Sequence, residues 1–254
     1  MPFEKGKGRT VFSYVTIMRF VVPLAIAGFA VASEYSGLDV FLARLFFDQA
    51  TQSWPLKSNF ITAGVLHKGA QRLVVYFAVG LLLFIALSFL IKKLRPYRKG
   101  AGYLLLCILL GTGIVSLLKS TTHIYTPWSL VLFGGDKPYI RLFDAVPPGL
   151  PVGHAFPGGH SSGGFAFVSL YFLLSVYRPR YRYYGLAFGL GLGALFAITQ
   201  ELRGAHFLSH DLFSLVICWY VAWALYPILF RREIGRSPMA SSVPEEGKGS
   251  VPRL

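Results

Sequence analysis

The chain has 254 residues, of which 54% are hydrophobic and only 14% are charged, and its mean hydropathy is +0.54. A soluble domain carries about 25% charged residues, so this composition argues against a soluble globular protein and indicates a chain embedded in lipid. The net charge of +14 does not indicate a nucleic-acid-binding protein, because the basic residues lie in short clusters between apolar runs, as in the cytoplasmic loops of membrane proteins.

Six apolar stretches are long enough, or nearly long enough, to cross a bilayer, for which a helix needs about 20 residues. We interpret the first as a retained helix and not as a cleaved signal peptide, because it is long and no clear cleavage site follows it. The fourth and fifth reach spanning length only if the polar motif residues beside them continue the helix. The predicted spans are Val11–Ser33, Arg72–Ile91, Ala101–Leu118, Gly163–Val176, Tyr184–Thr199 and Leu212–Phe230.

Lysine and arginine gather before the first span, in residues 92–99, in residues 178–182 and after the last span. Because such residues concentrate in the short cytoplasmic loops of membrane proteins, both termini are predicted to be inside. The sequence therefore predicts an all-α bundle of six transmembrane helices, formed by residues 1–234 as one domain. Residues 235–254 are rich in Ser, Pro, Gly and Glu and are predicted to form a flexible cytoplasmic tail.

Two longer segments between spans are predicted to lie on the outer side. The second of them, Lys119–His160, is rich in Gly and Pro and is too irregular to face lipid, and we interpret its Trp128, Phe133 and Tyr139 as interfacial anchors. The first, Glu34–Gln71, is predicted to contain an amphipathic helix in the interface, because apolar residues recur at helical spacing at Leu38, Phe41, Leu42, Leu45 and Phe46.

Polar residues gather at the predicted outer ends of the third, fourth and fifth spans. Lys119 ends the third span and precedes the sequence STTHIYTPW. The sequence FPGGHSSGG, residues 156–164, opens the fourth, where a glycine pair before a helix leaves N–H groups free for an anion. The sequence QELRGAHFLSHD, residues 200–211, follows the fifth, and in a helix its Arg203 and His206 would share one face, as would His206 and His210.

These groups together supply what phosphoryl transfer requires. Cations and N–H donors can hold the phosphate oxygens, and imidazoles can act as a nucleophile and as an acid for the leaving group. A carboxylate behind a histidine can fix its tautomer. The convergence of all three groups on one end of the bundle therefore favours an enzyme acting on a phosphate at the membrane surface.

Lys119 with Pro127, PGGHSS at residues 157–162 and RGAHFLSHD at residues 203–211 resemble the three-part signature of the type 2 phosphatidic acid phosphatase superfamily. The order of the motifs is similar, and the resemblance covers roughly Ala101–Phe230. The sequence His67-Lys68-Gly69-Ala70 further resembles a bacterial membrane branch of that group, which contains lipid A phosphatases.

The resemblance implies a role for each matching residue. His206 would be the nucleophile that forms a phosphohistidine, His160 would protonate the leaving oxygen and then activate water, and Asp211 would orient His206. The phosphate would be held by Lys119, Arg203, Ser161 and the Gly159 amide. It also implies a site without metal or cofactor, facing the periplasm from a bacterial inner membrane. The expected partners are the lipid phosphate and the bilayer, with no nucleic acid and no obligate protein partner.

The first motif departs from the family pattern, which usually has arginine immediately before the proline, where this chain has Thr126. One cation of the phosphate site is therefore absent or comes from another segment. The candidates for this substrate contact are His123 and Arg141.

The third motif departs twice. The family arginine usually stands six residues before the histidine, where this chain has Gln200, whereas Arg203 stands three before. The family acid usually stands four residues after the histidine, where this chain has His210, and Asp211 stands five after. We favour Asp211 as the partner that orients His206 and keep His210 as the alternative.

The resemblance leaves the substrate open among lipid A, phosphatidylglycerophosphate, phosphatidic acid and undecaprenyl pyrophosphate. The missing first-motif arginine favours a monophosphate. Two other functions remain as alternatives: a phosphotransferase that passes the phosphoryl group to a second lipid, and a membrane protein that binds lipid phosphates without chemistry.

Overall fold

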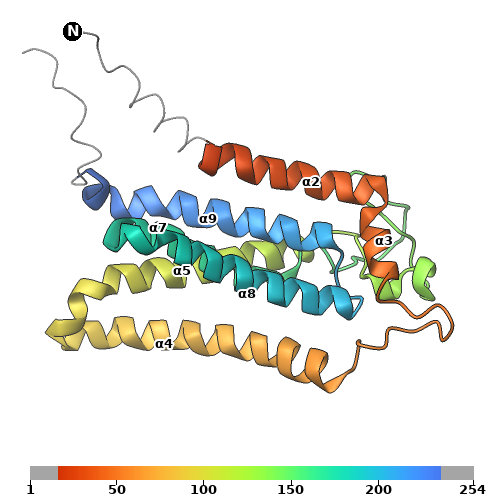
Figure 1. The fold of residues 1–254 in the computed structure, drawn as a ribbon, viewed down its shortest axis with the longest axis horizontal. Coiled ribbons are helices and arrows are strands. Elements are labelled where there is room, and N and C mark those ends of the chain that lie inside the picture. Colours follow the sequence, from red (N-terminus) through yellow and green to blue (C-terminus); the bar gives the residue numbers. More distant parts are fainter. Residues whose placement is uncertain (1–16, 236–254) are drawn as a thin grey trace, which may run out of the picture.

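The computed structural model describes residues 17–235, which form a bundle of long helices and, within that range, no β-strand (Figure 1). The first residues of the predicted first span, the basic N-terminal segment and the predicted tail at residues 236–254 lie outside the described part of the chain. The expected all-helical fold class is confirmed for the residues that are described.

The α-helices are α2 (Val22–Ser36), α3 (Leu38–Arg44), α4 (Ala70–Leu90), α5 (Arg98–Lys119), α6 (Gly159–Phe165), α7 (Ser169–Tyr177), α8 (Arg182–Leu202) and α9 (Leu208–Gly235). Two π-helical segments, η1 (Ile17–Val21) and η2 (Phe60–Gly69), lead into α2 and α4. The 3₁₀ turns are η3 (Lys92–Tyr97), η4 (Pro127–Ser129), η5 (Val131–Phe133), η6 (Ala166–Val168) and η7 (Pro179–Tyr181). The longest connections between helices lie between α3 and η2 and between α5 and α6.

Four helical stretches within the described chain are long and apolar enough to cross a membrane, namely Phe60–Leu90, Lys92–Lys119, Pro179–Leu202 and Leu208–Ile234. A fifth is reached if Arg19–Ser36 and Leu38–Arg44, which meet at a bend of 70°, count as one span. The predicted fourth span corresponds to α6, η6 and α7, three short pieces in series that are not among these candidate spans. A multi-pass helical membrane protein is thus confirmed, whereas the sixth span stays a prediction.

The helix before α4 begins earlier than the sequence predicts. We expected residues up to Gln71 to belong to an outer segment, but the structure is helical from Phe60, through η2. The Asn59 side chain accepts a hydrogen bond from the Ile61 N–H at 2.8 Å and so caps the start of this helix. Because His67 and Lys68 are polar, the sequence assigns them to a connection, but the structure places both inside the helical segment η2.

Glycines allow α8 to pack closely against the α6–α7 segment. A Cβ at Gly189 would clash with the backbone of Phe167 and Val168, and a Cβ at Gly193 would clash with the Phe165 ring. On the other side of the core, the Tyr103 hydroxyl of α5 donates to the Ala222 carbonyl of α9 at 2.9 Å. These contacts join α8 to the α6–α7 segment and α5 to α9.

The short helix α3 crosses the end of the bundle and fixes the start of α9 (Figure 1). The Asp39 carboxylate accepts from the Ser209 hydroxyl at 2.5 Å and from the Ser209 N–H at 3.2 Å. It also accepts from the Ser33 hydroxyl of α2 at 2.6 Å. A carboxylate at a helix N-terminus is favourable, so Asp39 holds the segment just after His206 in a defined position.

The interpretation of Phe133 as an interfacial anchor is wrong. Phe133 is 2% exposed and packs, together with Trp128 and Tyr139, in a second hydrophobic cluster beneath the outer connections. Its ring lies 5.2 Å from that of Trp54. The long outer segments are too irregular to face lipid. They pack instead around this cluster, which serves as their own hydrophobic core.

The basic connections lie together at the end of the bundle opposite α3. Figure 1 shows the α4–α5 connection, the α7–α8 connection and the C-terminal end of α9 at this end. A salt bridge of 2.7 Å between Lys99 and Glu233 joins two of them. The predicted topology places these basic connections on one side of the membrane, and they do lie at one end of the bundle. That this end faces the cytoplasm stays a prediction.

Candidate active site

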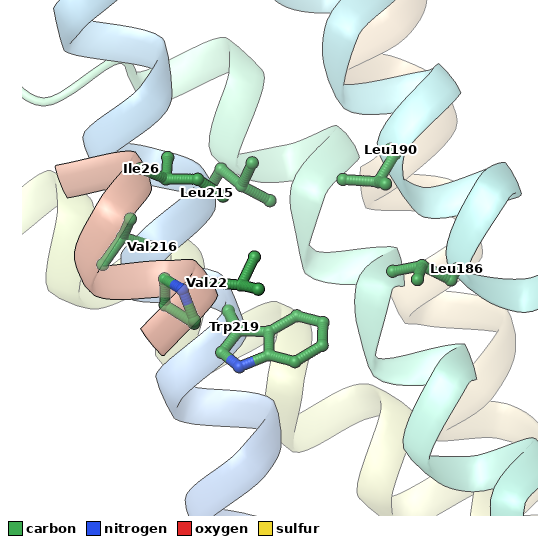
Figure 2. Close-up of a pocket in the computed structure, with 8 residues that line it drawn as sticks. Val22, Ile26, Leu186, Leu190, Leu215, Val216 and Trp219 are labelled. Atoms are coloured by element: carbon green, nitrogen blue, oxygen red, sulfur yellow. The ribbon is translucent and has the colours of Figure 1, made fainter. Parts of the chain in front are cut away.

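The cavity between α2, α8 and α9 is not where the polar motifs meet. It has a volume of about 90 Å³ and lies among apolar residues of the three helices (Figure 2). Its lining residues are Val22, Pro23, Ile26, Leu186, Leu190, Leu215, Val216 and Trp219. None of these side chains can bind or transfer a phosphoryl group, so the chemistry belongs to the polar end of the bundle.

The α8–α9 connection carries the central histidine, and it is not helical. In a helix, residues 203, 206 and 210 would share one face, but α8 ends at Leu202 and α9 begins at Leu208. Gly204 has φ +71°, which turns the chain away from the helix axis. Arg203 and His206 therefore reach the site from a turn, whereas His210 lies in the first turn of α9.

His206 is held by Asp211. The Nδ1 atom of His206 lies 2.8 Å from Oδ1 of Asp211, and both side chains are almost fully buried. An ionised carboxylate can only accept, so Nδ1 carries the hydrogen and Nε2 keeps its lone pair. The ring of His210 instead packs against Phe156 and Phe207.

The glycine pair of the second motif lies directly against this histidine. The Gly158 N–H donates to the His210 carbonyl at 2.9 Å, and a Cβ at Gly158 would collide with Asp211 Oδ1, Ser161 Oγ and His206 Nδ1. The Ser161 hydroxyl donates to the Gly158 carbonyl at 2.9 Å, so its expected contact with phosphate stays a prediction. Only glycine fits at position 158 without moving the histidine.

Two cations flank His206. A Cβ at Gly159 would lie 3.4 Å from Lys119 Nζ, which places the ammonium group beside the start of α6. Burial in the protein interior, together with the charges of Lys119 and Arg203, lowers the pKa of His206 well below its usual 6.5. The imidazole is therefore neutral near pH 7, which is the form that can act as a nucleophile.

Arg203 is oriented by two neighbours. Its Nε donates to the Lys57 carbonyl at 3.0 Å and its Nη1 donates to Gln200 Oε1 at 2.9 Å. The side chain is 8% exposed. Because a guanidinium has five N–H donors, this arrangement leaves others free for an anion.

His67 and Gln200 belong to the same cluster, although sequence reasoning gave neither a role. The ring of His67 stacks on that of His160 with the centroids 3.9 Å apart, and its Nδ1 lies 2.9 Å from Gln200 Nε2. The sequence His67-Lys68-Gly69-Ala70, which resembles one branch of the family, could have pointed to His67. Its assignment to an outer segment left His67 without a predicted role.

The structure does not bring Arg141 to this cluster. Its guanidinium pairs with Asp144 at 2.9 Å and lies over the Tyr35 ring. Thr126, which stands in place of the family arginine, shares a hydrogen bond with Ser129 at 2.8 Å. His123 is partly buried, and no contact joins it to His160 or His206 among the described residues.

Comparison with known proteins gives a consistent result. The model of the PAP2 superfamily matches residues 100–234, which contain all three motifs. The chain is 26% identical over 204 residues to the lipid A 4′-phosphatase of Francisella tularensis subsp. novicida (strain U112), which covers 78% of this chain and 89% of that protein. No solved structure matches the chain.

Proposed function

The chain belongs to the PAP2 superfamily, and from this membership we propose that it is a phosphatase of membrane lipid phosphates that works through a phosphohistidine at His206. The observation that carries the proposal is the buried pair of His206 Nδ1 and Asp211 Oδ1 at 2.8 Å. This pair leaves Nε2 as the nucleophilic atom, and Lys119 and Arg203 lie close enough to influence its charge.

In the first step, His206 Nε2 attacks the phosphorus atom and the bond from phosphorus to the ester oxygen breaks. Lys119, Arg203 and the Gly159 amide stabilise the charge on the equatorial oxygens. Burial and the neighbouring cations lower the pKa of His160 to about 3 in the free site, so the negative charge of the bound phosphate must raise this pKa before His160 can act as the acid. His160 then gives its proton to the departing lipid alkoxide, so that a neutral alcohol leaves. Asp211 stabilises the positive imidazole ring that carries the phosphoryl group.

In the second step, water replaces the histidine. His160, now neutral, takes a proton from water, and the resulting hydroxide attacks phosphorus while the phosphorus–nitrogen bond breaks. The products are inorganic phosphate and free His206. In the alternative phosphotransferase, a lipid hydroxyl would take the place of water in this step.

We propose a phosphate monoester as the substrate, with the phosphate of lipid A first among the candidates because of the similarity to a lipid A 4′-phosphatase. The end of the bundle that holds His206 would face the periplasm of a bacterial inner membrane. This placement follows from the predicted inside position of the basic connections. The acyl chains could then stay in the bilayer while the headgroup enters the site.

A panel of purified lipid phosphates tests the function. The panel contains lipid A, phosphatidylglycerophosphate, phosphatidic acid and undecaprenyl pyrophosphate, each in detergent with EDTA, and free phosphate and phosphorylated lipid are both measured. We expect free phosphate from lipid A, inhibition by vanadate, and no release by His206→Ala. Phosphorylated lipid in place of free phosphate would identify a phosphotransferase, and binding without turnover would identify a lipid-binding protein.

A further inference from the structure

His67 extends the site beyond the region that the family shares. It lies in η2, outside the matched residues 100–234, yet its ring stacks on that of His160 at 3.9 Å with the two planes 29° apart. It also lies within electrostatic reach of Lys119, Arg203 and His206. An imidazole from outside the three motifs therefore lies beside the residues assigned to phosphoryl transfer.

The hydrogen bonds around Gln200 determine the state of this imidazole. Arg203 can only donate, so the Gln200 atom that it contacts at 2.9 Å is the amide oxygen. The amide nitrogen of Gln200 then points to His67 Nδ1 at 2.9 Å and must be the donor there. Nδ1 is consequently an acceptor, and the hydrogen of a neutral His67 ring sits on Nε2.

The remaining nitrogen, Nε2, has no hydrogen-bond partner within residues 17–235, and the ring is only partly buried. An N–H donor is thus held ready beside His160. The chain needs such a donor, because Thr126 occupies the position of one family arginine and Gln200 that of another. Gln200 cannot supply a charge, but it can set the tautomer of a histidine that reaches the site from a different helix.

We propose that His67 is a further substrate-binding residue, whose Nε2–H donates a hydrogen bond to an oxygen of the bound phosphate, and that Gln200 is the positioning residue that keeps the proton on Nε2. The proposal rests on the proposed phosphatase function. Arg203, Gln200 and His67 are linked by two hydrogen bonds. In this proposal they together bind the phosphate oxygen that an arginine binds in relatives that follow the family pattern.

Two substitutions of His67 separate hydrogen bonding from stacking. His67→Phe keeps an aromatic ring against His160 but removes the donor, and we expect kcat/KM for lipid phosphate to fall about 10- to 100-fold, as for loss of a hydrogen bond to a charged group. His67→Gln places an amide N–H near the position of Nε2 and should recover a substantial part of that loss. Wild-type kcat/KM in His67→Phe would overturn the proposal, because stacking alone would then suffice.

Gln200→Glu tests the tautomer itself. A carboxylate still pairs with Arg203, but it can only accept from His67 Nδ1. In a neutral ring, which an assay at about pH 8 or above favours, the hydrogen then leaves Nε2 and that atom's lone pair turns toward the phosphate. We expect a loss of kcat/KM at least as large as in His67→Phe, and little further loss in the double variant. The matched control is Gln71→Glu, which adds the same charge at an exposed position of α4, four residues after His67.

The outcomes distinguish this inference from the proposed function. A fall in both Gln200→Glu and Gln71→Glu would show a general charge effect and overturn the tautomer argument. Thermal unfolding in detergent identifies a variant that fails to fold. Among folded variants, kcat/KM of His67→Gln must exceed that of His67→Phe, and equal values would overturn the hydrogen-bonding role of His67. If the wild-type protein releases phosphate and none of these variants differs from it, only the role of His67 falls.

Discussion

At the scale of single residues, the chemistry depends on which nitrogen of His206 is free. The 2.8 Å contact with Asp211 Oδ1 fixes the hydrogen on Nδ1. Asp211→Asn would preserve the shape of the pair but allow the wrong tautomer, so we expect phosphate release to fall about 10²- to 10⁴-fold. The matched control is Asp136→Asn, which changes an exposed carboxylate beside Lys137 and should leave the rate unchanged. Equal rates in the two variants would contradict the assignment.

The pH dependence of the rate reports the charge around His206. Because its pKa is lowered well below 6.5 by burial and by Lys119 and Arg203, the ring stays neutral as the pH falls past 6.5. We therefore expect kcat/KM to fall on the acid side only below pH 6.5. In Lys119→Gln this fall should occur at higher pH, because removal of a positive charge lets the His206 ring protonate more easily. Lys68→Gln, at an exposed position, is the control. An unmoved limb in Lys119→Gln would show that another group controls it.

Sequence reasoning found the residues of the three motifs because each motif carries its chemistry in a short run of residues. It gave His67 no role, because the segment was assigned to an outer connection and the contact with His160 joins residues that are far apart in the chain. It also placed Arg203 and His206 on one helix, because a glycine with positive φ cannot be told from an ordinary helical glycine in a single sequence. Sequence reasoning favoured Asp211 over His210 as the partner of His206, and in the structure Asp211 Oδ1 lies 2.8 Å from His206 Nδ1.

At the scale of elements, the packing of α8 against α6 and α7 depends on side-chain size at Gly189 but not at Gly191. Gly189 has no room for a Cβ, whereas Gly191 on the same helix has nothing within 4 Å of one. Gly189→Ala should lower the free energy of unfolding by about 1–3 kcal/mol through overpacking. Gly191→Ala should be neutral or raise it by up to about 1 kcal/mol, because alanine favours the helix. Thermal unfolding in detergent measures both, and an equal response would mean that the close contact does not limit the packing.

The apolar runs predicted the helices α4, α5, α8 and α9, but their ends were predicted less well. Hydropathy placed the start of the second span at Arg72, whereas the helix begins at Phe60 because Asn59 caps it and π-helical turns accommodate His67. The outer segment Lys119–His160 was predicted to be irregular, which is correct. Its aromatic residues could not be assigned to a buried cluster, since an aromatic residue near a span has the same appearance in sequence whether it faces a headgroup or a core.

At the scale of the whole molecule, the account requires the polar end with His206 and the basic end to lie on opposite sides of the membrane. Single cysteines at Asp136, in the outer connection, and at Lys93, in η3, test this, because both positions are exposed while native Cys107 and Cys218 are buried. A membrane-impermeant maleimide should label Asp136→Cys when applied from the periplasmic side and Lys93→Cys only in inverted vesicles. Labelling of both from one side would contradict the predicted topology.

The most direct test of the central claim is to trap the phosphoenzyme. Wild-type protein mixed with ³²P-labelled lipid phosphate and quenched in base should carry acid-labile, base-stable label on the peptide that contains His206, and the label should decay as free phosphate appears. His206→Ala should carry none. Label on another residue, or continued phosphate release by a correctly inserted His206→Ala protein, would contradict the account.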